Sequence, residues 1–211
     1  MESLGGKSVY EADITLNGGN GKLRVYAFDR PLRAVGRDLE QAFGIDGIAG
    51  GHGSMALATA HLDGIVLRLV AVDLTGGRQT MVFTVQQTER EFALSKEPPE
   101  DGAVGGIPAY PGSRPLFKAE DHNTGTALAV SRSGSPAAVV REFYRSRLPA
   151  DGWEEAIPNK NENTPHGDHP TAGPSLSVYM KPAAVCCVLA EENGFPNTSR
   201  ITIVHKTQRI D

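Results

Sequence analysis

The sequence has little cysteine. Only two of its 211 residues are Cys, and they are neighbours, Cys186 and Cys187. Adjacent residues of a strand point to opposite faces, so the two thiols are not placed to bond to each other. A small scaffold held together by disulfides is therefore excluded, while the redox compartment stays open. We expect both cysteines to act as small apolar core residues, or one to lie in the core and one at the surface.

Long apolar runs are also lacking. No stretch approaches the roughly 18–20 apolar residues of a membrane helix, so we expect no transmembrane segment. The first residues, Met1-Glu-Ser-Leu-Gly-Gly, show no basic region followed by an apolar run, and no signal peptide is visible. Two locations stay open: the cytoplasm, or the periplasm or exterior if an export signal has been removed.

No charge of one sign dominates. The chain has 21 Lys and Arg residues against 25 Asp and Glu residues, and a net charge of −4. A protein that binds nucleic acid or an anionic membrane through its charge carries a basic surplus, so neither partner is expected. A hydrophobic content of 39% over this length is enough for a sizeable core, in one large domain or two small ones.

The periodicity of apolar residues predicts a mixed α+β protein. Two amphipathic helices are expected, one with Asp29 as its cap and Pro31 in its first turn, and one that begins at Ser135-Pro136 and ends near Pro149. Alternating segments between turn signals predict strands, which cover residues 21–28, 55–62, 65–74, 81–87, 126–131, 176–181, 185–191 and 200–206. Further extended stretches precede these, at 9–16 and 116–120.

The elements follow the same order in both halves of the chain. This predicts two tandem, diverged repeats, each a mainly antiparallel sheet with one helix packed on a face. We place the first repeat at residues 1–100 and the second at 101–211, because the composition around 95–115 is typical of a linker. The second repeat carries an insertion at 158–174. Whether the two sheets are separate or continuous is left open by the pattern.

The best candidates for metal ligands are His166, Asp168 and His169, with Glu162 upstream. Imidazole and carboxylate groups at short spacing can meet one ion. However, tight sites draw ligands from separate rigid elements, and this loop is rich in Pro and Gly. A polar surface loop is the simpler interpretation, so we expect no tightly bound metal and no cofactor.

Two further patterns bear on phosphate binding and on nucleophilic catalysis. The glycine-rich turn 50–54, with His52 inside it, follows a helix and opens a strand, which is the reverse of a phosphate-binding loop. A nucleophile is not indicated either, because the cysteines lie in an apolar segment where a thiolate is disfavoured. No catalytic residue is assigned, and the pattern favours a protein without enzymatic activity.

Three aromatic residues near the end of the second helix, Phe143, Tyr144 and Trp153, have two interpretations. They either line a pocket or belong to the core. We favour the core, because the turn Asp151-Gly152 lays Trp153 back across the end of the helix.

The second half resembles a loose group of bacterial domains of unknown function. The residues that carry the likeness are Tyr110-Pro-Gly112, the helix segment Val140-Arg-Glu-Phe-Tyr144 and Gly152-Trp153, within a stretch of residues 107–206. Members of that group are often found in exported or envelope proteins. The resemblance implies a bacterial origin and an envelope location, and it supplies no catalytic residues.

The sequence therefore favours a non-catalytic binding or scaffolding protein of the bacterial envelope that recognises another protein through a sheet face or edge. A first alternative is a small-ligand or metal-binding protein that uses the 158–174 loop. A second is an enzyme whose site is assembled from distant residues. The partner and the oligomeric state are not indicated by any pattern.

Overall fold

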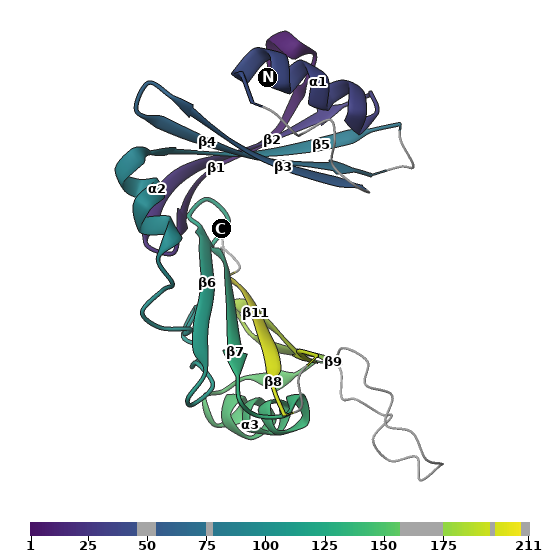
Figure 1. Ribbon diagram of the computed structural model, residues 1–211. Coiled ribbons are helices and arrows are strands. Elements are labelled where there is room, and N and C mark those ends of the chain that lie inside the picture. The colour runs from purple at the N-terminus through teal and green to yellow at the C-terminus, as the bar shows by residue number, and fades with distance from the viewer. Residues whose placement is uncertain (46–53, 75–77, 157–174, 195–196, 208–211) are drawn as a thin grey trace. The chain divides into compact units, whose positions relative to one another are not determined.

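The computed structural model describes residues 1–45, 54–74, 78–156, 175–194 and 197–207. The chain divides into two compact units, Met1–Lys96 (unit 1) and Glu97–Asp211 (unit 2). Figure 1 shows the helices and strands of each unit. No helix among the described residues is long and apolar enough to cross a membrane, as expected.

The prediction of two tandem repeats with a sheet each is wrong. The eleven strands belong to one antiparallel sheet, in the order β3-β4-β5-β2-β1-β6-β7-β11-β10-β9-β8, accompanied by three α-helices. Periodicity identifies strands, and short turns identify antiparallel neighbours within a hairpin. Whether two hairpins far apart in sequence join into one sheet depends on their free edges, which the pattern does not report.

Unit 1 contains five strands in the order β3-β4-β5-β2-β1. It also contains a short 3₁₀ helix, Glu2–Leu4, and two α-helices. The elements are β1 (Lys7–Leu16), β2 (Gly19–Phe28), α1 (Leu32–Phe43), β3 (Met55–Leu62), β4 (Ile65–Asp73), β5 (Thr80–Thr88) and α2 (Glu89–Lys96).

Helix α1 covers one face of the unit 1 sheet (Figure 1). It buries Val35 and Leu39 in a cluster with Phe28 and Leu69. The helix ends at Gly44 in the left-handed conformation (φ 62°), where its N–H bonds to the carbonyl of Glu40. At the start of α1, the prediction that Asp29 caps the helix is wrong.

Pro31 is the N-cap residue of α1, and no side chain caps the helix. Asp29 instead accepts a hydrogen bond of 3.0 Å from the amide of Gln79.

Helix α2 was not predicted, because its sequence shows no clear apolar stripe. Phe92 and Ser95 are its buried residues. The Ser95 hydroxyl donates to Gln87 Oε1 at 3.3 Å, and Gln87 Nε2 donates to the carbonyl of Asn20 at 3.0 Å. These bonds hold α2 against β2 and β5 on the face of the sheet opposite α1.

Unit 2 contains six strands in the order β6-β7-β11-β10-β9-β8, with helix α3 packed on one face. Its elements are β6 (Arg114–Asp121), β7 (Thr126–Ser133), α3 (Ala137–Ala150), β8 (Glu154–Glu155), β9 (Ser175–Lys181), β10 (Ala184–Glu192) and β11 (Ser199–Thr207). Helix α3 continues through Pro149 to Ala150, and Asp151 is its C-cap residue, so the helix ends close to the predicted place.

The start of α3 is stabilised by a residue that is distant in sequence. Ser135 does not cap the helix; the backbone N–H of Ala137 donates to Glu192 Oε1 at 2.9 Å. A carboxylate at this position satisfies a free N–H and complements the helix dipole. Ser135 Oγ instead accepts a hydrogen bond from Tyr110 Oη at 3.1 Å.

The core of unit 2 includes the aromatic residues that the sequence placed there. Trp153 is buried, with 4% of its surface exposed, in one cluster with Tyr144, and Phe143 packs against that cluster. The backbone N–H of Trp153 donates to the carbonyl of Leu148 at 3.1 Å, so the chain does reverse at the end of α3. The core interpretation of Trp153 is confirmed.

Candidate functional site

The candidate metal ligands lie outside the described residues; they are Glu162, His166, Asp168 and His169. His52 of the glycine-rich turn lies outside them as well. Within the part of the chain that the structure describes, no three His, Cys, Asp or Glu side chains gather in a way that could hold a metal ion.

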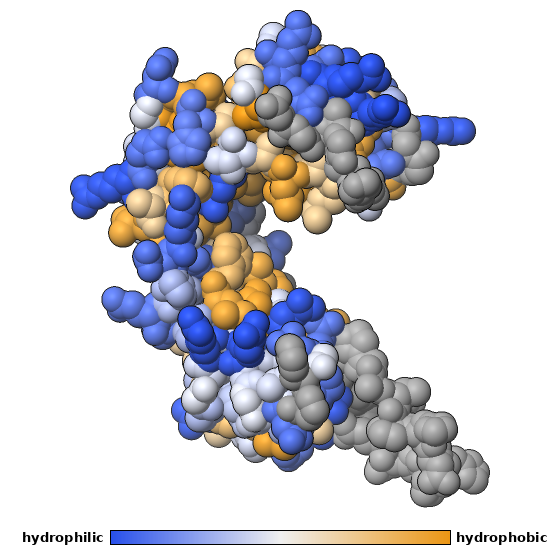
Figure 2. Space-filling view, in the orientation of Figure 1, coloured by the Kyte–Doolittle hydropathy of each residue, from blue (hydrophilic) through white to orange (hydrophobic). Residues whose placement is uncertain are grey.

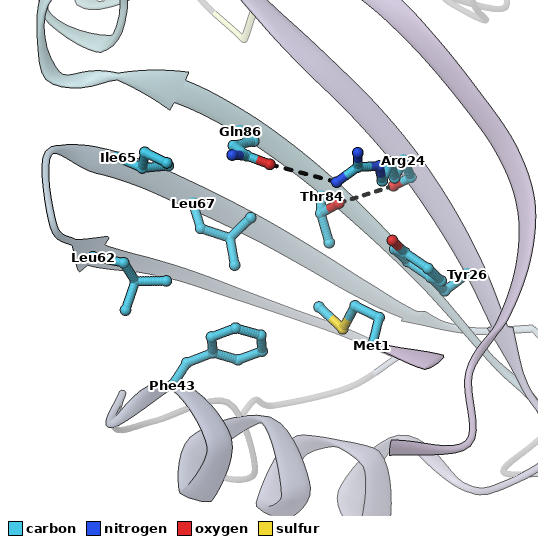
Figure 3. A pocket seen from close by; sticks show the side chains of 9 residues that line it. All are labelled: Met1, Arg24, Tyr26, Phe43, Leu62, Ile65, Leu67, Thr84 and Gln86. Atoms are coloured by element: carbon cyan, nitrogen blue, oxygen red, sulfur yellow. Dashed lines mark hydrogen bonds between the residues drawn. The ribbon is translucent and has the colours of Figure 1, made fainter. Parts of the chain in front are cut away.

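A pocket of about 250 Å³ lies in unit 1, on the face of the sheet that carries α1 (Figure 3). Strand alternation places one set of residues there, because Arg24 of β2 is in register with Thr84 of β5, and Gln86 of β5 with Leu67 of β4. The end of α1 closes one side through Phe43. The other lining residues are Met1, Tyr26, Leu62 and Ile65.

The polar rim of this pocket is already paired. Arg24 donates from Nε to Glu11 Oε2 at 2.7 Å and from Nη1 to Gln86 Oε1 at 3.5 Å. The hydrogen bond from Arg24 is the main reason that the pKa of Glu11 lies below its usual value. Lys22 lies 3.2 Å from Glu11 and 3.5 Å from Asp13, so the charges at this rim balance.

The chemistry of the pocket follows from this lining. The described lining residues include no His, Cys, Asp or Glu, so they supply no acid–base pair. By scaling from a cavity of about 150 Å³ that holds benzene, the volume suits an apolar molecule of about ten non-hydrogen atoms. The described lining thus combines an apolar floor with a polar rim whose charges are paired.

A larger feature is the face of unit 2 opposite α3. Along β7, β10 and β11, one set of alternate residues is buried under α3 and the other set is not. That second set includes apolar residues of β7 and β10, whereas on β11 Val204 lies between Thr202 and Lys206. We call this second set the open face of unit 2, and its main members are Leu128, Val130, Leu176, Met180, Leu189 and Val204.

The open face of unit 2 is exposed at Leu176, Met180 and Val204, and half-buried at Leu128, Val130 and Leu189. Leu176 keeps 59% of its surface accessible and Val204 keeps 37%. An antiparallel sheet with a helix on one side normally presents polar residues on the other side. Exposed apolar residues on this second side therefore depart from the usual pattern.

One border of the open face of unit 2 carries a row of arginines. Arg114 is opposite Arg132 on the neighbouring strand, and Arg132 is opposite Arg200. Glu191 closes the row, 2.7 Å from Arg200. Like charges directly opposite each other on neighbouring strands destabilise a sheet. The row is thus an arrangement that carboxylates of a partner would relieve.

The two neighbouring cysteines differ in burial. The thiol of Cys186 is fully buried, and this burial raises its pKa to about 12. Burial thus keeps the Cys186 thiol protonated at neutral pH. Cys186 faces the core and Cys187 is half-buried on the open face, so one of the two alternatives stated for the cysteines is correct.

Sequence reasoning noticed apolar strand faces but assigned no residue to them. The signal that identifies the open face of unit 2 is the run Val185-Cys-Cys-Val-Leu189, which is apolar at consecutive positions instead of alternating. The pocket had no such signal, because its lining comes from the N-terminus and five separate elements. No family model, no curated protein and no solved structure matches this chain.

Proposed function

We propose that this chain is a non-catalytic binding protein that holds another protein against the open face of unit 2. The observation that carries the proposal is the exposure of Leu176, Met180 and Val204 on a sheet face that also carries Leu128, Val130 and Leu189. Each apolar side chain that a partner covers there contributes roughly 25 cal/mol per Å² removed from water. A central apolar area of this kind is typical of an interface core.

The row of Arg114, Arg132 and Arg200 narrows the chemistry of the partner. Its guanidinium groups border the apolar area, as charged residues border the core of many interfaces. A partner that places carboxylates against this border and apolar side chains against the face complements both. The chain's own net charge of −4 does not favour a nucleic acid in this role.

An envelope location is part of the same proposal. It rests on the resemblance of residues 107–206 to bacterial domains of exported and envelope proteins. Fractionation of cells that express the natural gene tests it: the protein is expected with the envelope or periplasm, and recovery only in the cytoplasm contradicts it.

A second candidate function is the binding of a small apolar molecule, and the pocket beside Phe43 and Leu67 favours it. Ligand-observed NMR with a library of fragments of about ten non-hydrogen atoms tests it. Fragments that bind wild type and not Leu67→Trp, which fills the pocket, support this function. Fragments that bind both proteins equally, or none at all, rule it out.

Site-specific photocrosslinking tests the main proposal. A photoreactive amino acid is placed at Val204, on the open face of unit 2, or at Val139, which is 50% exposed on α3. In cells that naturally make the protein, we expect a discrete crosslinked product from position 204 and none of the same size from 139. Equal products from both positions, or none from 204, contradict the proposal.

A further inference from the structure

Strand β3 is the edge strand of the unit 1 sheet, and its outer edge is unpaired among the described residues. In the sheet order it is the first strand, and among the described residues it pairs only with β4. The strand at the opposite end of the order is β8, which is two residues long, and both residues are Glu. Short length and charge are the usual means by which a protein prevents a sheet edge from pairing. Strand β8, at one end of the sheet, thus has such protection.

The eight residues of β3, Met55-Ala-Leu-Ala-Thr-Ala-His-Leu62, contain no Lys, Arg, Asp, Glu or Pro. The register with β4 is regular from Leu62 to Met55, without a bulge. Met55 is 50% exposed and Leu57 is 64% exposed, and both lie on the face opposite α1. Figure 2 shows hydrophobic surface where β3 borders unit 1. The described strand therefore has none of the usual protective features.

The turn after β3 determines which backbone groups are free. Asp63 and Gly64 have φ values of 43° and 81°, which is the pattern of a two-residue type I′ hairpin. In that hairpin the flanking residues Leu62 and Ile65 form a hydrogen-bonded pair. The same alternation at the other end is visible, because the N–H of Asp73 donates to the carbonyl of Ser54 at 2.7 Å.

Even-numbered residues of β3 therefore bond inward to β4. The N–H and C=O groups of Met55, Leu57, Thr59 and His61 point outward, away from the sheet. They form a row of alternating donors and acceptors that matches the backbone of another strand.

We propose that this outer edge of β3 receives an extended segment of another protein, which adds to the sheet as a further strand. The proposal rests on the proposed function in one respect, that the chain binds another protein, but it uses a different surface. The free backbone groups supply affinity, and the side chains supply selectivity.

The side chains of β3 define what the segment carries. On the face with Met55 and Leu57, the segment places apolar residues beside two exposed apolar side chains. On the other face, β3 presents only the small residues Ala56, Ala58 and Ala60 before Leu62. An uncharged segment that is apolar at every second position fits this edge.

The size of the edge favours a peptide segment over a second copy of the chain. Eight residues at about 3.3 Å each give an edge about 26 Å long. Pairing along such an edge alone buries much less than the roughly 1,200–2,000 Å² of a stable interface between globular proteins. A lone strand needs less area, because it has few other groups to position.

The test uses the full-length protein and a displayed library of random octapeptides. Peptides selected on wild type are synthesised, labelled with fluorescein and titrated by fluorescence anisotropy. We expect apolar residues at every second position, and a dissociation constant at least tenfold weaker for Thr59→Pro. Proline at position 59 removes an outward N–H and leaves the bonds to β4 in place. Thr59→Ser, which keeps the N–H, should bind as wild type does.

A second arm leaves the protein unchanged, in case Thr59→Pro fails to fold. A selected peptide that is N-methylated at alternate residues lacks the donors for the edge, and it should bind at least tenfold more weakly than its parent. On saturation with the parent peptide, hydrogen exchange of the amides of Leu57, Thr59 and His61 should slow. Selected peptides that bind Thr59→Pro and wild type equally, or that bind equally when N-methylated, overturn the proposal.

Two outcomes distinguish the strand site on β3 from binding at the open face of unit 2 and from dimerisation. A peptide that loses binding with Val204→Glu but not with Thr59→Pro occupies the open face of unit 2, which supports the proposed function and overturns the strand site. A wild-type protein that dimerises in sedimentation while Thr59→Pro stays monomeric makes the occupant a second copy, and this overturns the assignment to another protein.

Discussion

The indole ring of Trp153 meets the imidazole ring of His205 edge to face, with ring centroids 6.0 Å apart and an angle of 80° between the ring planes. Lys181 Nζ lies 4.7 Å from the centroid of the same indole. These residues come from the end of α3, from β11 and from β9, so Trp153 connects the helix of unit 2 to its sheet. Four predictions about stability and reactivity follow from contacts within unit 2.

Removal of the indole should destabilise the protein strongly. Trp153 is 4% exposed and lies in the core cluster with Tyr144 and Leu148. We expect Trp153→Ala to lower the free energy of unfolding by about 3–5 kcal/mol in denaturant melts. The control is Val139→Ala on the exposed side of α3, with an expected change within about 0.5 kcal/mol. A loss below about 1 kcal/mol for Trp153→Ala is incompatible with its place in the core.

His205 should make stability depend on pH. Burial, followed by the nearby charge of Lys181, lowers the pKa of His205 in the folded protein below the ordinary value of 6.5. Between the lowered pKa and about 6.5, the unfolded chain binds a proton that the folded protein does not. The neutral form of His205 therefore makes its full contribution to the free energy of unfolding above about pH 6.5. This contribution decreases as the pH falls below that value.

The measurement is the free energy of unfolding of wild type and of His205→Gln at several pH values from 4 to 8. Their difference isolates His205 from the other histidines. We expect the loss of stability of wild type on acidification to exceed that of His205→Gln. Parallel curves for the two proteins contradict this prediction.

The two cysteines should differ in reactivity. Cys186 is fully buried with its pKa raised to about 12, while Cys187 is half-buried on the opposite face of β10. With iodoacetamide at neutral pH, native protein should gain one label, on Cys187, and a second label only after denaturation. Peptide mass spectrometry identifies the labelled residue, and faster labelling of Cys186 than of Cys187 excludes the proposed burial.

Glu192 and Glu191 are adjacent and have different roles, so their alanine variants form a matched pair. Glu192 accepts the N–H of Ala137 at the start of α3, whereas Glu191 pairs with the exposed Arg200. Glu192→Ala should destabilise the protein by about 1 kcal/mol, as the loss of a helix cap does. Glu191→Ala should have a smaller effect, about 0.5 kcal/mol or less, because its partner is exposed. The reverse order in thermal or denaturant melts argues against the cap.

Local features of the fold were predictable from sequence. The turn Asp63-Gly64 and the strands on either side of it follow from residue type and alternation, and both were found. The end of α1 at Gly44 follows from residue type, because glycine takes the left-handed conformation there without strain. The burial of Trp153 followed from the turn before it.

Features that join distant residues were not predictable. The cap of α3 comes from Glu192, which is 55 residues away along the chain, and the ring beside Trp153 belongs to His205 on another strand. The single sheet depends on which strand edges meet. Helix α2 was overlooked because its burial rests on Phe92 and on hydrogen bonds to Gln87, rather than on a clear apolar stripe.

The candidate binding surfaces were likewise predictable only in their local features. Sequence periodicity indicates that residues 185–189 are apolar on both faces, but it does not indicate which of those faces α3 covers. The metal candidates His166, Asp168 and His169 lie outside the described residues, so the prediction that they bind no metal tightly stays a prediction. Elemental analysis of dialysed protein checks it, and stoichiometric zinc or nickel that is lost in His166→Ala/His169→Ala contradicts it.

The most direct test of the account is the affinity of the chain for the protein that crosslinks to position 204. Calorimetry compares wild type with Val204→Glu on the open face of unit 2, and with Val139→Glu on α3, a substitution of the same type at a residue that is 50% exposed. We expect the dissociation constant to rise at least tenfold for Val204→Glu, because a charge is then buried against apolar groups, and to change less than twofold for Val139→Glu. Equal dissociation constants for the two variants would contradict the central claim that the open face of unit 2 holds the partner.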